Sequence, residues 1–378
     1  MALKQQYSFI EIARVVCIFV VVFVHTLDMA TAAAGNTALT LALSPGLRFV
    51  VPAFFMISGL LLGLRHRDPH YRVDARVFWS RRAHTLILPF FVWNIVYMII
   101  LVIIPGNSIF DGETLFNVTT GYMHLYFVIV LVQCLVLYTL LAKFFSARLL
   151  RVSVAIAALS SFAFYAVSQA LLWTVGPDDH LFEWRLGKLV FGWALFFFWG
   201  IWLGYEADIF ERLTKYRFWL LAAAVVAFVP YWLSTVSEFT SSGTLSRDYF
   251  LLGGLPYQFI AANAFLAFFY GWETRFSQNA FAQRLVGWGQ YMFGVYVAHL
   301  ALLLYLAPLW YQLLPTIPFA ISIPCITVLT FTITLAFVKA CGTPGLAFVG
   351  SILFGGRGKQ EPVRGTNEKS PRAVEALR

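Results

Sequence analysis

The chain has 378 residues, of which 60% are hydrophobic and only 12% are charged. About a quarter of the residues of a soluble domain are charged, so this composition excludes an ordinary soluble protein and predicts an all-α, polytopic membrane protein. The net charge of +9 does not indicate a nucleic-acid partner, because the basic residues cluster in short loops between apolar segments.

Ten apolar segments follow one another, each close to the roughly 20 residues that a helix needs to cross a bilayer. We predict spans at residues 9–29, 46–64, 84–104, 123–143, 151–175, 187–206, 216–236, 249–272, 287–312 and 316–340. A cleaved signal peptide is the alternative for the first, but its length and internal charges favour a retained helix. We expect one membrane domain over residues 1–342 and a basic cytoplasmic tail over 343–378, disordered from about residue 355.

The loop charges predict the orientation of these spans. Residues 65–83 hold six arginines, whereas residues 105–122 hold neither Lys nor Arg. Basic residues recur in alternate loops further along, and loops rich in Lys and Arg stay in the cytoplasm. The sequence therefore predicts that both termini are cytoplasmic.

The first span carries ionisable residues, which are costly in a membrane and are therefore functional candidates. Arg14 and His25 are eleven residues apart, which places them on one helix face and roughly 16 Å apart along the axis. Glu11 can pair with Arg14, whereas we expect no acidic neighbour close to His25. Histidine suits proton transfer near neutral pH. A packing role for His25 and neutralisation of a helix end for Arg14 are the alternatives.

The second span, LRFVVPAFFMISGLLLGL, places Arg48 near the outer end and Ser58 towards the inner end. Pro52 is expected to kink this helix and to free a backbone carbonyl, which is tolerated where the helix lines a cavity. Ser58 with Gly59 is also typical of a small-residue notch for helix packing.

Later spans place further polar residues at the depth of His25. His124 and Tyr126 begin the fourth span, and Tyr296 and His299 lie in the ninth. Together with Arg48 they predict a polar cavity open to the outside. No pair of histidines has a metal-ligand spacing such as HExxH, so we predict no metal.

These segments together resemble the bacterial integral-membrane acyltransferase-3 family. EIARVVCIFVVVFVH resembles its first helix, RFVVPAFFMISG its second, and FWSRRAHTLILPFF the basic entry to its third. MHLYFVIVLVQ and YMFGVYVAHL resemble a middle and a late helix, and FGWALFFFWGIWLGYE is similar to members that modify exopolysaccharides. The family's first acid is usually Asp, and here it is Glu11. His84 or Thr85 stands where the family often has a second arginine, which leaves open whether Arg81 or Arg82 takes its role.

The resemblance implies transfer of a short acyl group, acetyl or succinyl, from cytosolic acyl-CoA to a sugar hydroxyl of an extracytoplasmic or surface polysaccharide. It implies a multi-pass protein of the bacterial inner membrane, with acyl-CoA as a co-substrate and no tightly bound cofactor. The expected partners are a polysaccharide or lipid-linked glycan, the lipid bilayer and an exopolysaccharide synthase complex. The expected site residues are His25 and Arg48 for catalysis, Arg14, Ser58, Arg81 and Arg82 for the donor, and Glu11, His124, Tyr126, Tyr296 and His299 for the acceptor side or cavity.

In this interpretation His25 removes the hydroxyl proton and Arg48 stabilises the developing oxyanion. An acyl-histidine intermediate is an open alternative. Two other functions also stay open, namely an exporter of glycans or lipids without acyl-transfer chemistry, and an acyltransferase that moves a fatty acyl chain onto protein or lipid.

Overall fold

The computed structural model describes residues 8–34, 38–103, 116, 119–175, 185–242 and 250–355. No strand occurs in these ranges, so the predicted all-α class is confirmed. Eight helical segments among them are long and apolar enough to cross a membrane: Ser8–Thr31, Thr40–Arg65, Ala75–Ile100, Met123–Phe144, Ala147–Leu171, Arg217–Thr240, Met292–Leu313 and Phe319–Cys341.

The described residues form helices and short helical turns. In chain order they are α2 Ser8–Ala34, α3 Ala38–Leu47, α4 Val50–Arg65, α5 Ala75–Arg82, the π-helical turn η1 Ala83–Ile87, α6 Leu88–Ile103, η2 Met123–Leu125, α8 Tyr126–Leu141, η3 Ala142–Phe144, α9 Ala147–Val175, η5 Leu186–Lys188, η6 Val190–Gly192, α10 Ala194–Tyr205, α11 Ala207–Lys215, α12 Arg217–Ser242, α13 Gly254–Gly271, α14 Glu273–Gln278, α15 Ala280–Gly289, α16 Met292–Leu313, α17 Phe319–Cys341, η8 Pro344–Leu346 and α18 Ala347–Phe354.

Two of the ten expected spans differ from the prediction. The segment 187–206 forms two short 3₁₀ turns followed by α10, which is too short to cross a bilayer without its preceding turns. The segment 249–272 forms α13, which buries the polar side chains of Gln258 and Asn263 and is therefore less apolar than the other long helices. Both helices pack inside the bundle, against α4.

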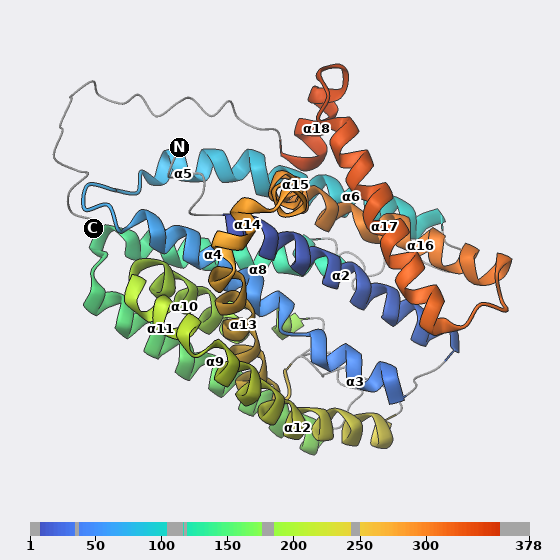
Figure 1. Ribbon diagram of the computed structural model, residues 1–378, viewed down its shortest axis with the longest axis horizontal. Helices are drawn as coiled ribbons and strands as arrows, with labels where there is room; N and C mark the ends of the chain where they lie inside the picture. Colours follow the sequence, from blue (N-terminus) through green and yellow to red (C-terminus); the bar gives the residue numbers. More distant parts are fainter. Residues whose placement is uncertain are drawn as a thin grey trace.

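Helix α2 occupies the centre of the bundle (Figure 1). It packs against α4, α13, α15, α16 and α17, and Ile10, Ala13 and Cys17 on it are fully buried. The Glu273 carboxylate of α14 accepts the backbone N–H of Phe9 at 2.7 Å and so satisfies part of the first turn of α2. Since protein surrounds α2, its polar side chains face other helices rather than lipid.

The second span is broken between α3 and α4, as the proline predicted. Pro52 has no N–H to donate to the carbonyl of Arg48, four residues earlier, and its ring crowds that carbonyl. The helix accordingly ends at Leu47 and restarts at Val50. The break places Arg48 at a bend, where its side chain turns inward.

Helices α4 and α10 touch through glycines on both sides. Added β-carbons at Gly59 and Gly63 would lie 2.1 and 2.0 Å from backbone oxygens of α10, and those at Gly200 and Gly204 would lie 2.1 and 2.2 Å from backbone oxygens of α4. Small residues four apart on both helices allow this backbone approach. The packing-notch interpretation is therefore confirmed for Gly59, one residue beside Ser58.

The start of the C-terminal tail packs against the helix of the third span. The helix that begins at Ala75 contains the π-helical turn η1, a feature that often occurs at functional sites. After α17 the chain forms α18, whose Leu353 carbonyl accepts a hydrogen bond of 2.8 Å from the Trp93 indole. Gly355 has a φ of +70°, and an added β-carbon there would lie 2.6 Å from Cα of Thr85. The tail is thus helical over 347–354, while its expected disorder concerns residues outside the described ranges.

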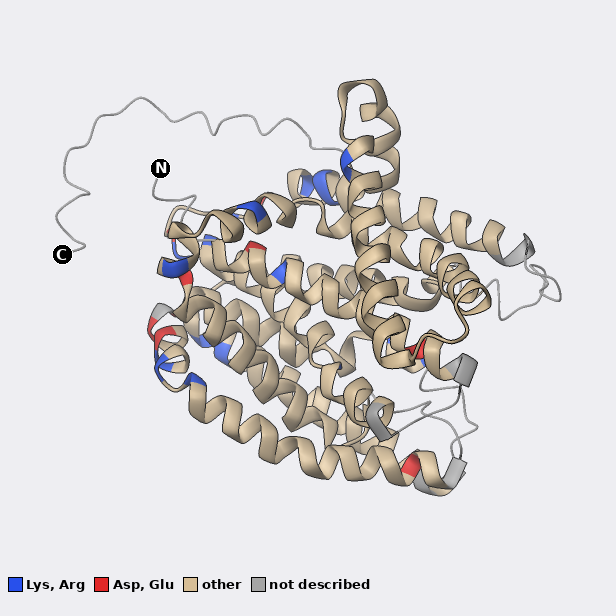
Figure 2. Ribbon diagram, turned by 45° about the vertical axis from the view of Figure 1, so that its right-hand side comes forward, with Lys and Arg blue, Asp and Glu red and all other residues tan. Residues whose placement is uncertain are grey.

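The charged residues are distributed unevenly over the bundle. Figure 2 shows the Lys and Arg residues gathered mainly on the left and upper side, and fewer charges on the opposite side. The segments that carry them include residues 65–83, in which Arg67 donates to the Gly204 carbonyl at 2.6 Å and residues 75–82 form α5. This asymmetry follows the loop-charge pattern on which the predicted orientation rests.

Candidate active site

A cavity of about 820 Å³ runs beside α2. Its wall includes residues of α2 from Arg14 to Thr31, a stretch of roughly 25 Å at 1.5 Å per residue. The polar and charged residues of the wall are Arg14, His25, Asp28, Thr31, Thr40, Ser44, Arg48, Ser58, Arg82, Thr85, His124, Tyr126, Lys188, Gln290 and Tyr296. The cavity therefore connects a group around Arg14 with a group around His25.

Positive charge dominates the Arg14 end of the cavity. Arg14 donates to Glu11 at 3.0 Å, as the sequence predicted. Arg82 also lines the cavity, and Arg65 and Arg14 are its nearest cationic neighbours. Three arginines with one nearby carboxylate make a site suited to an anion, which guanidinium groups bind with bidentate geometry.

Three predicted site residues lie off the cavity wall. Glu11 faces α15, where an added β-carbon at Gly289 would lie 2.1 Å from its carboxylate, so it supports Arg14 instead of reaching the cavity. Arg81 is exposed, and its neighbour Arg82 has the inward position. His299 is fully buried behind the wall. Of the two residues in the place of the family's second arginine, Thr85 lines the cavity and His84 is exposed.

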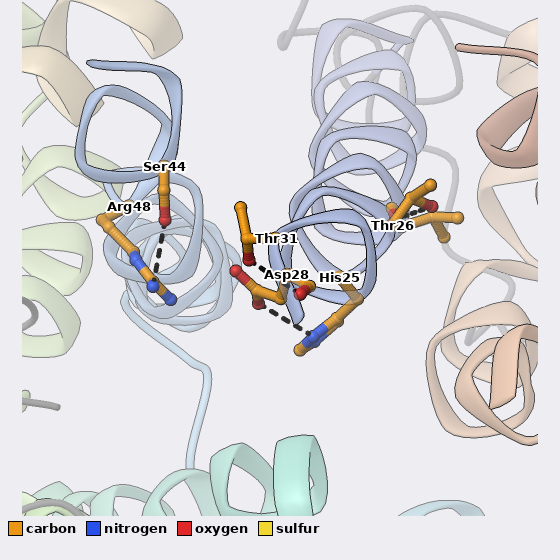
Figure 3. Close-up of polar contacts among 7 residues, drawn as sticks. His25, Thr26, Asp28, Thr31, Ser44 and Arg48 are labelled. Atoms are coloured by element: carbon orange, nitrogen blue, oxygen red, sulfur yellow. Dashed lines mark hydrogen bonds and ion pairs between the residues drawn. The ribbon is translucent and has the colours of Figure 1, made fainter. Parts of the chain in front are cut away.

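At the other end, His25 has a carboxylate partner. Its Nδ1 lies 3.7 Å from the Asp28 carboxylate, three residues further along α2. The expectation that His25 has no acidic neighbour was therefore wrong. Figure 3 shows Asp28 between His25 and Arg48. Arg48 is the other charged neighbour of Asp28, and it donates to the Ser44 hydroxyl at 3.1 Å.

Three histidines from distant parts of the chain meet at His25. The centroid of the His25 ring lies 5.8 Å from that of His124 and 5.4 Å from that of His299. The His124 and His299 centroids are 4.9 Å apart. The sequence placed these residues at a similar depth, and the fold brings their rings into contact.

His124 is held by α16 through a reciprocal pair of hydrogen bonds. Its Nε2 donates to the Tyr296 carbonyl at 2.9 Å, and the Tyr296 hydroxyl donates to the His124 carbonyl. The turn before it is strained, since Met123 has a φ of +45°, which costs about 1–3 kcal/mol for a residue with a side chain. Asn94 fixes this turn by accepting the Tyr122 N–H at 2.9 Å. Such strain is typical of backbone that positions a functional group.

Two further charged residues of the wall were not predicted. Asp28 has the same three-residue spacing from His25 that Arg14 has from Glu11, so the sequence contained a signal for it. Lys188 in η5 is only 5% exposed, and its ammonium group donates to the Thr120 hydroxyl at 2.9 Å. Gln133 of α8 holds this turn by donating to the Lys188 carbonyl at 2.8 Å. Only the packing of η5 against α8 brings this lysine to the cavity.

The described residues contain no group of three or more His, Cys, Asp or Glu side chains arranged to hold a metal ion. The absence of a metal and of a tightly bound cofactor stays a prediction. The arrangement itself offers a histidine beside a carboxylate and an arginine, the combination that positions a general base near a donor for an oxyanion. A separate cationic end, about 16 Å away along α2, offers an anion site.

Comparison with known proteins supports the resemblance. Residues 7–339 match the acyltransferase-3 family, which is described as an acyltransferase domain. Similar curated proteins are the "Probable poly-beta-1,6-N-acetyl-D-glucosamine export protein" of Staphylococcus aureus strains MSSA476 and MRSA252, each 25% identical over 188 residues. The alignment covers 48% of this chain and 50% of each relative, so the chain spans about half the length of the curated relatives it matches. No solved structure matches it. Because the family match extends over nearly the whole sequence, this chain belongs to the acyltransferase-3 family of multi-pass membrane proteins.

Proposed function

We propose that this protein transfers a short acyl group from acyl-CoA to a sugar hydroxyl of an extracytoplasmic polysaccharide. The observation that carries the proposal is the cavity that joins Arg14 and Arg82 to the His25–Asp28 pair. The name of the Staphylococcus aureus relatives points to poly-β-1,6-N-acetyl-D-glucosamine as the class of acceptor. The protein is proposed to lie in the bacterial inner membrane with both termini in the cytoplasm, and to work beside an exopolysaccharide synthase.

The donor fits the cationic end of the cavity. Arg14 and Arg82 would hold the phosphates of acyl-CoA, and Thr85 and Ser58 line the path along which the pantetheine arm would extend. The arm would bring its thioester to His25, roughly 16 Å away along α2. Acetyl and succinyl are the two short acyl groups that the resemblance to the family implies.

The acceptor reacts at the other end. The Asp28 carboxylate faces Nδ1 of His25, which leaves Nε2 to take the hydroxyl proton as the oxygen attacks the thioester carbonyl. Arg48 donates to the developing oxyanion, a contribution of the kind that reduces kcat by about 10²–10³ when it is removed. The carbon–sulfur bond then breaks, and His25 returns its proton to the CoA thiolate. The products are the sugar ester and free CoA.

Replacement of His25 tests this function. His25→Ala, expressed at wild-type level in the membrane, should remove the ester from the surface polysaccharide, as measured by NMR of the purified glycan. Base catalysis contributes about 10²–10⁴-fold, so residual ester should be below detection. Full ester content with His25→Ala would overturn the assignment.

Export of a glycan without acyl transfer is the second candidate. The names of the Staphylococcus aureus relatives favour it, and a cavity along a central helix also suits a transport path. Normal surface polysaccharide, fully secreted but lacking its ester in the His25→Ala strain, would favour acyl transfer. Loss of secreted polysaccharide with intact ester on the remainder would favour export.

A further inference from the structure

One nitrogen of His124 has no partner although it is buried. The residue is 5% exposed and lines the cavity, while its Nδ1 makes no hydrogen bond to any of the described residues. A buried polar atom without a partner is rare and needs an explanation. Either the site carries an uncompensated cost, or a molecule in the cavity supplies the missing partner.

The fold determines what kind of partner this nitrogen takes. The other ring nitrogen, Nε2, faces the carbonyl oxygen of Tyr296 at 2.9 Å. A carbonyl only accepts, so Nε2 must carry the hydrogen. In the neutral imidazole the remaining nitrogen then holds a lone pair, and Nδ1 of His124 is a hydrogen-bond acceptor.

His299 also has one ring nitrogen bonded and one without a partner among the described residues, but it lies away from the cavity wall. Its Nδ1 donates to the Tyr296 carbonyl at 2.7 Å, and its Nε2 is likewise without a partner among the described residues. However, His299 is fully buried and does not line the cavity. Of the two free lone pairs, only that of His124 belongs to a residue on the wall.

We propose that Nδ1 of His124 accepts a hydrogen bond from a second hydroxyl of the glycan, next to the hydroxyl that reacts at His25. The inference rests on the proposed function and names the acceptor class more closely: a sugar unit with two neighbouring free hydroxyls. The centroids of the His25 and His124 rings lie 5.8 Å apart, and both residues line the cavity. A phosphate, carboxylate or ester oxygen at this place would set lone pair against lone pair.

The strained turn is consistent with a recognition role. Met123, with its positive φ, and His124 both line the cavity. The Tyr296 hydroxyl and the Asn94 amide hold the backbone on either side. The ring is therefore fixed before the glycan arrives, and a fixed acceptor loses little freedom on binding.

Two substitutions of His124 distinguish recognition of a glycan hydroxyl from a purely structural role. The amide of Asn reaches the place of Nδ1, and that of Gln reaches the place of Nε2. His124→Asn therefore keeps an acceptor at the place of Nδ1 and loses the bond to Tyr296, whereas His124→Gln keeps the bond to Tyr296 and loses the acceptor. If His124 recognises a hydroxyl, the Gln variant raises the acceptor KM about 2- to 10-fold, and the Asn variant raises it less.

The experiment uses the full chain in lipid nanodiscs, with acetyl-CoA and a β-1,6-linked N-acetylglucosamine pentasaccharide, and with analogues that lack one hydroxyl on each sugar. In the wild type, one analogue should keep the reacting hydroxyl yet lose about 2- to 10-fold in kcat/KM. In His124→Gln that analogue and the parent sugar should react equally, because the partner is already gone.

Two results overturn the inference alone: a Gln variant that keeps the wild-type acceptor KM while the Asn variant loses it, or an analogue penalty of equal size in all three proteins. Absence of any ester with the wild-type protein overturns the proposed function as well.

Discussion

Asp28→Asn is the substitution that examines the His25 site most closely. It removes the negative charge and keeps the shape of the side chain. Two unit charges attract by about 1 kcal/mol in water and about 4.5 kcal/mol at an effective dielectric constant of 20, when they are separated by the 3.7 Å between His25 and Asp28. The Asp28 side chain is 44% exposed, so solvent screens the pair. We expect kcat to fall about 10- to 100-fold, or roughly 1.4–2.7 kcal/mol.

The assay is acetyl transfer from acetyl-CoA to the pentasaccharide by purified protein. The KM for acetyl-CoA should change little, because Asp28 lies at the opposite end of the cavity from Arg14. Thr26→Val is the control, since its hydroxyl donates to the Val22 carbonyl within the same helix and the residue does not line the cavity. An Asp28→Asn variant with unchanged kcat, beside an inactive His25→Ala variant, would refute the role of the carboxylate.

Three further predictions concern the donor end, helix packing and pH. Arg14→Ala should raise the KM for acetyl-CoA more than that for the pentasaccharide, and a rise in the sugar KM alone would contradict donor binding at this end. Gly200→Ala would place a β-carbon 2.1 Å from the Met56 carbonyl, where real contacts begin near 3.0 Å, so α4 and α10 must separate by about 0.9 Å. We expect a loss of about 1–3 kcal/mol and a lower unfolding temperature in detergent, whereas Gly287→Ala, with open space around it, should match the wild type. Burial, with the charge of Arg72 second, lowers the pKa of His66 to about 4. The unfolded chain takes up this proton near pH 6.5, so stability should decline as the pH falls from about 6.5 towards 4; His66→Phe should flatten that decline, and an equally steep decline in this variant would assign it to other groups.

The sequence was sufficient for the features that depend on helical periodicity. Arg14 and His25 share one face of α2, and both line the cavity as their eleven-residue separation predicts. The bend at Arg48 follows from Pro52 four residues later, because proline affects the carbonyl at that distance. Residues three apart also lie on one helix face, so helical periodicity was sufficient to place Asp28 beside His25.

Contacts between segments that are distant in the sequence could not be predicted from helical periodicity. Lys188 enters the cavity because η5 packs on α8, and His299 leaves the wall because its ring lies behind those of His25 and His124. Neither position has a local signal. Likewise, the eight residues of α18 are too few to predict a helix, and they form one against α6 and α17.

Acetyl transfer across the membrane of sealed proteoliposomes, from acetyl-CoA outside to a sugar inside, tests the central claim most directly. Vesicles that enclose the pentasaccharide would receive radiolabelled acetyl-CoA on the outside only, and protein oriented with its arginine-rich loops outward would be selected by protease accessibility. The account predicts labelled ester on the enclosed sugar with the wild type and none with His25→Ala. Loss of unlabelled sugar from the vesicles, with no ester formed, would contradict acyl transfer and establish transport instead.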